Sequence, residues 1–282
     1  MAHAQPLGLP LGLQLYSVRD QLQRDFPGTL KQVGSLGYKE VEAAGFYGRT
    51  AKQTSSAMQA AGLRCVSAHY PLPTLQPQLE EIIGYGKELG LEYIVCSSPG
   101  RRDGGKASTG GKQPLDLDDW RWNAEQFNRI GETVHAAGLR FGYHNHTEEF
   151  RRQQGVLPYD ELLRLTDPAK VTMEMDCGWV IVGGQSPVEY LKRYPTRFSM
   201  LHVKDFRSKD FKVGTNGSKA PASGSAEPVS TELGRGSIDY RPIFEAARKA
   251  PIRHAFVEQE SFDMEPFAAL KIDAEYMRRL QV

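Results

Sequence analysis

Short apolar runs alternate along the chain with longer amphipathic stretches. Eight runs are rich in β-branched and aromatic residues, and several are almost continuously apolar, as strands buried on both faces of a parallel sheet are. They predict strands at 11–18, 40–45, 65–70, 93–99, 140–146, 171–179, 198–206 and 254–260. Apolar residues at helical spacing fill the intervals. They predict helices at 27–36, 50–61, 75–89, 118–137, 158–166, 187–194, 240–250 and 264–280.

Glycine marks the joints between these elements. Ala60-Ala-Gly-Leu-Arg64 and Ala136-Ala-Gly-Leu-Arg140 each close a predicted helix with a glycine cap and then enter a strand. Eight such units in 282 residues match the size of a single α/β domain folded as a (β/α)8 TIM barrel. A doubly wound sheet is the alternative, but no Gly-x-Gly-x-x-Gly follows any predicted strand.

Some segments fall outside this plan. Residues 1–10 predict a flexible N-terminus, and 207–230 and 100–117 predict two long loops, of which 207–230 looks mobile. Both loops follow strand C-termini, so covers over a site and disordered segments are both open interpretations. Ala2-His3-Ala4 has the small-x-small pattern of a cleavage site without a preceding apolar stretch. A trimmed export signal and an ordinary start therefore stay open, and with them a periplasmic or a cytoplasmic location.

Composition narrows the partners. The formal net charge is +1, so no global field favours nucleic acid. No run of about 18 apolar residues predicts a membrane span. Cys65, Cys96 and Cys177 are an odd number without close spacing, and all lie in predicted strands. They predict buried free thiols rather than disulfides or a zinc ribbon.

Four predicted strands close on residues that bind metals. His144, Asp176, His202 and Glu258 share the same strand-end position. The C-terminal ends of barrel strands converge on one mouth, and neighbouring strands are about 5 Å apart. A lone histidine in a strand is more often a hydrogen-bonded core residue, but four such ends together predict one divalent ion. Mn, Co, Mg and Zn all accept this mixture of imidazole and carboxylate.

The same region carries a family resemblance. The residues that carry it are Leu13-Gln-Leu-Tyr-Ser-Val-Arg19, Tyr143-His-Asn-His146, Glu174-Met-Asp176, Leu201-His-Val-Lys-Asp205, Leu233-Gly-Arg-Gly-Ser-Ile-Asp239 and Val257-Glu-Gln-Glu260. In these motifs the chain resembles sugar phosphate isomerase/epimerase-type proteins of the xylose-isomerase-like barrel superfamily, which also holds ketose 3-epimerases, inosose dehydratase and apurinic-site endonucleases. The resemblance covers nearly the whole chain and is specific to the superfamily, not to a substrate. It implies a small carbohydrate substrate, and a homo-oligomer is one expectation because related barrels are often dimers or tetramers.

The resemblance departs from the epimerase pattern at one ligand. In the ketose epimerases a Glu, an Asp, a His and a second Glu bind the metal, and the last three match Asp176, His202 and Glu258. His144 stands where the first Glu is usual. Epimerases use the two Glu residues on opposite faces of the substrate, and a metal-bound imidazole has no lone pair left for that task. The departure favours elimination, which needs one strong base.

The remaining polar residues at the predicted mouth receive expected roles. Glu258 is the expected base. His146 either protonates the leaving group or orients a ligand, and both interpretations stay open. Glu174 points inward in phase with Asp176, so we expect it to fill the barrel in an ion pair. The expected substrate contacts are Gln14, Glu42, His69, Glu149, Trp179, Lys204 and Glu260.

These inferences favour an enzyme that acts on a sugar or keto-polyol. It would be an isomerase, epimerase or lyase that abstracts a proton alpha to a carbonyl through a metal-stabilised enediolate. One alternative is a phosphodiester hydrolase of the apurinic-endonuclease type, against which the near-neutral charge and lack of a basic groove count. Another is a non-catalytic sugar-binding barrel.

Overall fold

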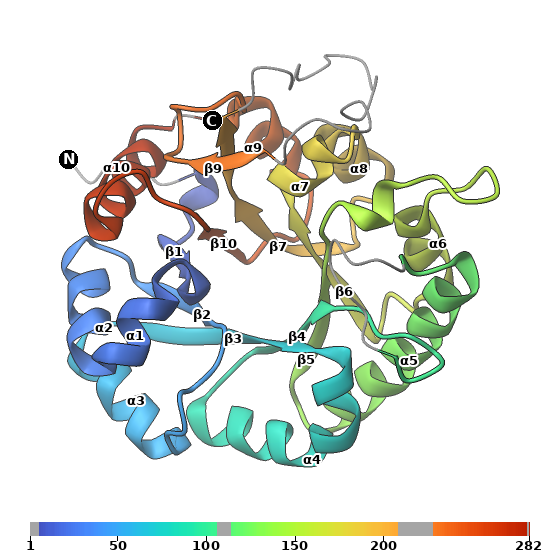
Figure 1. Cartoon of the computed structure of the whole chain (residues 1–282), viewed down its shortest axis with the longest axis horizontal. Coiled ribbons are helices and arrows are strands. Elements are labelled where there is room, and N and C mark those ends of the chain that lie inside the picture. Colours follow the sequence, from blue (N-terminus) through green and yellow to red (C-terminus); the bar gives the residue numbers. More distant parts are fainter. Residues whose placement is uncertain (1–5, 106–113, 208–227, 281) are drawn as a thin grey trace.

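The computed structural model describes residues 6–105, 114–207, 228–280 and 282. All eight predicted strands form, and they close a parallel barrel in the order β1-β10-β7-β6-β5-β4-β3-β2 (Figure 1). The predicted TIM barrel is therefore confirmed. The barrel strands are β1 Gly12–Gln14, β2 Glu40–Ala43, β3 Arg64–Pro71, β4 Tyr93–Ser98, β5 Arg140–His144, β6 Val171–Asp176, β7 Phe198–Val203 and β10 His254–Val257.

The predicted helices form an outer ring around the barrel (Figure 1). Side-chain caps define several of their starts: Thr50 and Asp116 each make a capping box with the residue three positions on. Their apolar stripes pack against the outer faces of the strands in one large core. The helices are α2 Phe26–Ser35, α3 Ala51–Ala60, α4 Leu72–Leu89, α5 Leu117–Ala136, α6 Pro158–Leu165, α8 Pro187–Arg193, α9 Arg241–Ala247 and α10 Pro266–Arg279.

Three predicted strands change into another helix or strand inside their expected range. The first stops at Gln14 and continues as the 3-10 helix Leu15–Val18, ahead of the short helix α1 Arg19–Arg24. The sixth stops at Asp176, where the buried helix α7 Cys177–Val182 begins, so Cys177 is helical. The apolar periodicity of a buried strand and of a short buried helix is the same, which explains these errors.

The seventh predicted strand also divides. β7 ends at Val203, and β8 Asp205–Arg207 pairs antiparallel with β9 Val229–Thr231 above the barrel. The pairing partner lies more than 20 residues away, so local pattern does not reveal it.

The remaining predictions concern the N-terminal segment, the two long loops, the cysteines and membrane-spanning helices. Within the predicted N-terminal segment, Pro6–Gly8 form a 3-10 helix with Pro6 buried. Ala2-His3-Ala4, residues 106–113 and most of 207–230 lie outside the described residues. The three cysteines are buried and free, as predicted. In the described ranges, no helix combines the length and apolar character that a membrane crossing needs.

The barrel interior is layered. Side chains on a strand point inward at every second position. On β10, His254 lies at the lower end, Phe256 in the middle and Glu258 just past the upper end. Phe256 belongs to an apolar layer that is fully buried inside the barrel and separates two polar layers. The members of the apolar layer are Val66, Tyr93, Val95, Met200 and Phe256.

Candidate active site

The structure brings the four predicted metal ligands together. One ligand atom from each of His144, Asp176, His202 and Glu258 lies within 4.8 Å of the others, and all four residues are buried. Asp176 Oδ2 lies 4.0 Å from His144 Nε2 and from His202 Nδ1. This oxygen accepts no hydrogen bond inside the protein. Two imidazoles and two carboxylates, one of which has such an oxygen, fit a divalent ion.

The sequence suggested that the four predicted ligands lie at one level of the barrel, but they do not. His144 pairs in register with Glu174, two residues before Asp176. Asp176 pairs with His202, but His202 pairs with Phe256, two residues before Glu258. Barrel strands are staggered, so each step around the barrel moves the register. The side chains converge in spite of this because their lengths and directions compensate for it.

Asp176 is held by the joint between strand and helix. It ends β6 and caps α7, with Oδ1 accepting a hydrogen bond from Trp179 N at 2.8 Å. Asn145 accepts from the Asp176 backbone N–H at 3.1 Å and donates to its carbonyl at 3.3 Å. The carboxylate is thereby fixed, and Oδ2 is left toward His144, His202 and Lys204.

A deeper pair of carboxylates contacts the opposite edges of the two histidines. Glu174 Oε2 lies 3.1 Å from His144 Nδ1, and Glu42 Oε1 lies 2.8 Å from His202 Nε2. When these nitrogens carry the protons, His144 Nε2 and His202 Nδ1 turn their lone pairs toward Asp176. Such pairing of histidine with a carboxylate orients metal ligands in proteins. Glu174 thus contacts histidines in the barrel interior, consistent with its expected place.

His69 completes this deeper layer. Its Nε2 lies 2.8 Å from Glu42 and 2.7 Å from Glu174, and its ring stacks on His202 at 5.5 Å between centroids. Burial alone would lower the pKa of His69, but the two glutamates outweigh it and raise the pKa to about 9. His69, His144, Glu174 and His202 form a second group whose ligand atoms lie within 4.8 Å. The sequence analysis named these four residues separately but did not predict that they form one group.

The charge states of the histidines differ. Burial, helped by His202, lowers the pKa of His144 well below its usual range. Burial and Lys204 lower the pKa of His146 to about 3. Both imidazoles are therefore neutral near pH 7, the form that ligates metals. For His202, Glu174, Glu258 and Glu42 outweigh burial and raise the pKa.

Lys204 lies in the middle of the carboxylates. It is fully buried, and Nζ is 3.2 Å from Asp176 Oδ2, 2.7 Å from Glu258 Oε2 and 2.5 Å from Glu260 Oε1. Burial would raise the pKa of Glu258, but Lys204 and His202 outweigh it and hold the pKa below its usual range. Burial raises the pKa of Asp176 to about 6, although Lys204 acts in the opposite direction.

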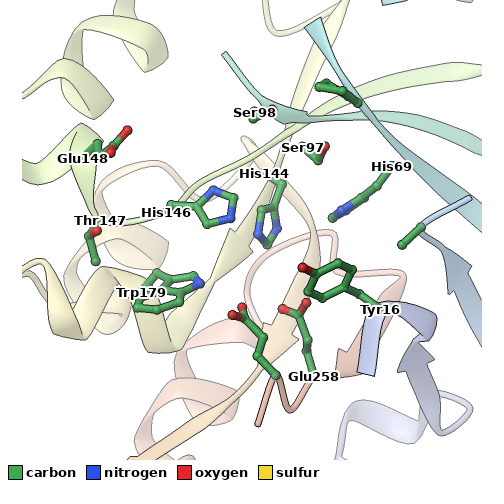
Figure 2. Close-up of a pocket in the computed structure, with 13 residues that line it drawn as sticks. Tyr16, His69, Ser97, Ser98, His144, His146, Thr147, Glu148, Trp179 and Glu258 are labelled. Carbon is green, nitrogen blue, oxygen red and sulfur yellow. The ribbon is translucent and has the colours of Figure 1, made fainter. Parts of the chain in front are cut away.

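A cavity of about 450 Å³ opens above this cluster (Figure 2). His69, His146, Trp179 and Glu260, all predicted, line it together with the ligands His144 and Glu258. The apolar pattern did not predict the other polar and aromatic lining residues, which lie at the end of β4, in 3-10 helices and in the connection after β5. They are Tyr16, Ser97, Ser98, Thr147 and Glu148. Figure 2 shows the indole nitrogen of Trp179 turned toward the ligands, and Nε1 has no partner within the protein.

Four expected substrate contacts lie away from the cavity surface, and one of them is the fully buried Lys204. Gln14 donates to Glu42 at 2.7 Å, and both are fully buried below the ligands. Glu149 is buried behind the cavity, where it accepts hydrogen bonds from the Tyr143 hydroxyl at 2.6 Å and from His146 N at 3.0 Å. Burial raises the pKa of Glu149 to about 7. The alternation of a strand shows that a side chain points inward, but not how deep it lies.

Known proteins resemble the chain over most of its length. An inosose dehydratase from Clostridium botulinum is 28% identical and covers 79% of this chain and 77% of its own. One from Geobacillus thermodenitrificans is 26% identical over 90% of this chain and 89% of its own. A crystal structure of a sugar phosphate isomerase/epimerase from Parabacteroides distasonis superposes with a TM-score of 0.72 at 27% identity, covering 96% and 94% of the two chains.

A more distant neighbour adds only the fold. A xylose isomerase-like TIM barrel protein from Mycobacterium smegmatis, solved in complex with magnesium, has a TM-score of 0.70 at 12% identity and covers 98% and 97%. The model of the xylose isomerase-like TIM barrel family matches residues 30–280. The chain therefore belongs to the xylose isomerase-like TIM barrel family.

Proposed function

We propose that this protein is a metal-dependent enzyme that removes a proton alpha to the carbonyl of a sugar or cyclic keto-polyol, and that it acts as a lyase. The observation that carries the proposal is the cluster of His144, Asp176, His202 and Glu258 under the cavity. The similarity to inosose dehydratases supports a keto-polyol substrate and loss of water.

The cluster supports one position for the proposed metal. His144 Nε2, Asp176 Oδ2, His202 Nδ1 and Glu258 would hold it, and a bound divalent ion polarises a carbonyl and stabilises the charge left by the departing proton. Glu258 lines the cavity and is ionised near pH 7, so its carboxylate is available to accept the proton. Trp179 and Tyr16 present aromatic surface to the substrate ring.

The second proton transfer decides between the reaction types. A 3-epimerase needs an acid on the face opposite Glu258, and His144 offers a buried neutral imidazole in that position. His146 lines the cavity, is neutral and has an unpaired Nδ1. A neutral imidazole donates a hydrogen bond through its N–H, so His146 can hold a leaving oxygen while that oxygen takes up the proton that Glu258 has accepted. This arrangement favours elimination of water or an alcohol.

The test is product analysis with the metal-loaded protein. In D₂O, we expect inosose and 3-keto-glycosides to lose the leaving group, as followed by NMR, with little 3-epimerisation of free ketohexoses. Replacing His144 by Glu should raise epimerisation relative to elimination, because it restores the missing carboxylate. Efficient epimerisation of a ketohexose by the unmodified protein would refute the lyase assignment. Cleavage of abasic duplex DNA would replace it by phosphodiester hydrolysis.

A further inference from the structure

Lys204 occupies the side of the cluster where the proposed metal would bind. Its ammonium contacts Asp176 Oδ2 at 3.2 Å and Glu258 Oε2 at 2.7 Å. These are the same two oxygens that face the histidine nitrogens, since His202 Nδ1 lies 3.1 Å from Glu258 Oε2 and 4.0 Å from Asp176 Oδ2. A lysine side chain and a divalent ion would therefore take the same lone pairs.

Both cations cannot hold these oxygens equally. Lys204 and His202 are fully buried, so water does not screen charges at this position. Repulsion between an ammonium and a divalent ion that share two oxygen ligands is large at such distances. Either the ion is bound weakly or the ammonium moves.

The ammonium has partners away from the two ligand oxygens, namely Glu260 and the ring of Trp179, whose centroid lies 4.8 Å from Nζ. The backbone of Lys204 is clamped by the Tyr240 hydroxyl, which accepts from Lys204 N and donates to Lys204 O, both at 2.7 Å. The side chain is free of that clamp, and its Nζ already contacts Glu260 at 2.5 Å. Glu260 lines the cavity, and about a third of its side chain is exposed. A small rotation would keep this contact and release the two ligand oxygens.

We propose that Lys204 competes with the divalent ion for Asp176 and Glu258, and that metal binding shifts its ammonium onto Glu260 at the cavity wall. The proposal rests on the proposed function, because it takes the metal site from it. It gives Glu260 a defined role as the carboxylate that receives Lys204. It also makes the metal-loaded protein the one in which a cation is available beside the substrate. Substrates with an oxygen anion or a hydroxyl near Glu260 would bind after the metal.

The test is Mn²⁺ affinity measured by calorimetry, with no substrate and no turnover. Lys204→Met keeps most of the stem and removes the charge, so we expect the Kd for Mn²⁺ to fall at least tenfold. Glu260→Gln should raise the Kd several-fold in the wild type, because Lys204 then stays on Glu258. In the Lys204→Met background the same change should have less than half that effect on the logarithm of the Kd. Lys204→Gln, with thermal melting as the check of folding, serves if the Met variant does not fold.

The outcomes separate the two proposals. A Kd that stays the same or rises on loss of the Lys204 charge overturns the competition, while one-to-one Mn²⁺ binding that His202→Ala abolishes keeps the metal site. Equal effects of Glu260→Gln in both backgrounds overturn the role of Glu260. Binding seen only after Lys204→Met supports the competition in its strongest form. No Mn²⁺ binding by any variant overturns both proposals.

Discussion

The two ends of the barrel contain similar residues, but these residues differ in their role. At the lower end, His254 Nδ1 contacts Glu40 at 2.7 Å, and Arg64 forms ion pairs with Glu40 and Glu92. At the upper end, Glu42 belongs to the same strand as Glu40, and Glu258 follows the same strand as His254. The apolar layer with Phe256 separates the two clusters.

The difference lies in how the charges are paired. In the lower cluster the half-exposed guanidinium of Arg64 forms ion pairs with both Glu40 and Glu92. In the upper cluster the only cation that the described residues supply to Asp176 and Glu258, besides histidine, is the buried ammonium of Lys204. Asp176 keeps an oxygen without a hydrogen bond, and a cavity lies above. Residue type alone therefore does not identify a site. Incomplete pairing beside a cavity does.

The largest effect should come from the expected base. Glu258→Gln keeps the volume of the side chain but removes the carboxylate, so we expect turnover to fall by about a thousandfold. Substrate affinity should change little. Steady-state rates with the elimination substrate measure this, and Glu40→Gln at the lower end is the matched control, expected to keep turnover within about threefold. Activity of the Glu258 variant near that of the wild type would exclude it as the base.

Metal affinity should distinguish the ends next most strongly. His202→Ala removes a ligand nitrogen, so we expect Mn²⁺ binding to weaken by at least about a hundredfold. His254→Ala, which removes a histidine of equal burial from the lower end, should leave the Kd unchanged. Calorimetric titration of both variants gives the comparison. An equal loss in both would mean that metal affinity reflects global stability rather than this site.

Stability should show the reverse order. Glu40→Gln leaves His254 and Arg64 without their shared carboxylate, so we expect the free energy of unfolding to drop by about 1–3 kcal/mol. Urea denaturation followed by circular dichroism measures it. Removal of the Asp176 charge by Asp176→Asn should cost less stability, because Oδ2 accepts no hydrogen bond and Lys204 keeps its ion pairs with Glu258 and Glu260. A larger loss for Asp176→Asn would contradict the assignment of the two ends.

A carboxylate outside both ends should have an effect on stability that is limited to high pH. Asp273 on α10 accepts from Leu233 N at 2.7 Å, and burial raises its pKa to about 7. The folded protein thus holds a proton that the unfolded chain releases near pH 4, so this group stabilises the fold fully below about pH 4 and progressively less up to about pH 7. Asp273→Asn should stabilise the protein by about 1–3 kcal/mol at pH 8 and not at pH 4. Urea midpoints at both pH values test it, and an equal shift at both would show that the group does not titrate.

Much of this structure was predictable because the signals are local. Glycine caps and apolar runs located all eight barrel strands, and the residue that closes a strand located His144 and Asp176 at the mouth. Depth was not predictable, since the pattern along one strand contains no information on register with its neighbours. Glu42 therefore lies below the ligands instead of facing the cavity.

Other parts depend on contacts between distant segments. Tyr16 lines the cavity from a 3-10 helix, where the apolar pattern predicted a strand. Glu148 lines it from a short 3-10 helix after β5. Lys204 lies among three carboxylates because segments that are distant in the sequence meet at this point. The alternation of side chains along its strand predicted the direction of Lys204 but not these partners.

The direct passage from β6 into α7 limits how this site can diverge. Asp176 serves the cluster with one oxygen and starts the helix with the other, and that helix carries Trp179 into the cavity wall. A change at this position would alter the ion-binding side and the substrate wall at once. Ser97, Ser98 and Thr147 also line the cavity, and the Thr147 side chain makes no capping hydrogen bond, so changes at these positions would leave the joint between β6 and α7 intact. On the proposed function, the scaffold therefore constrains the reacting groups more tightly than the residues that would contact the substrate.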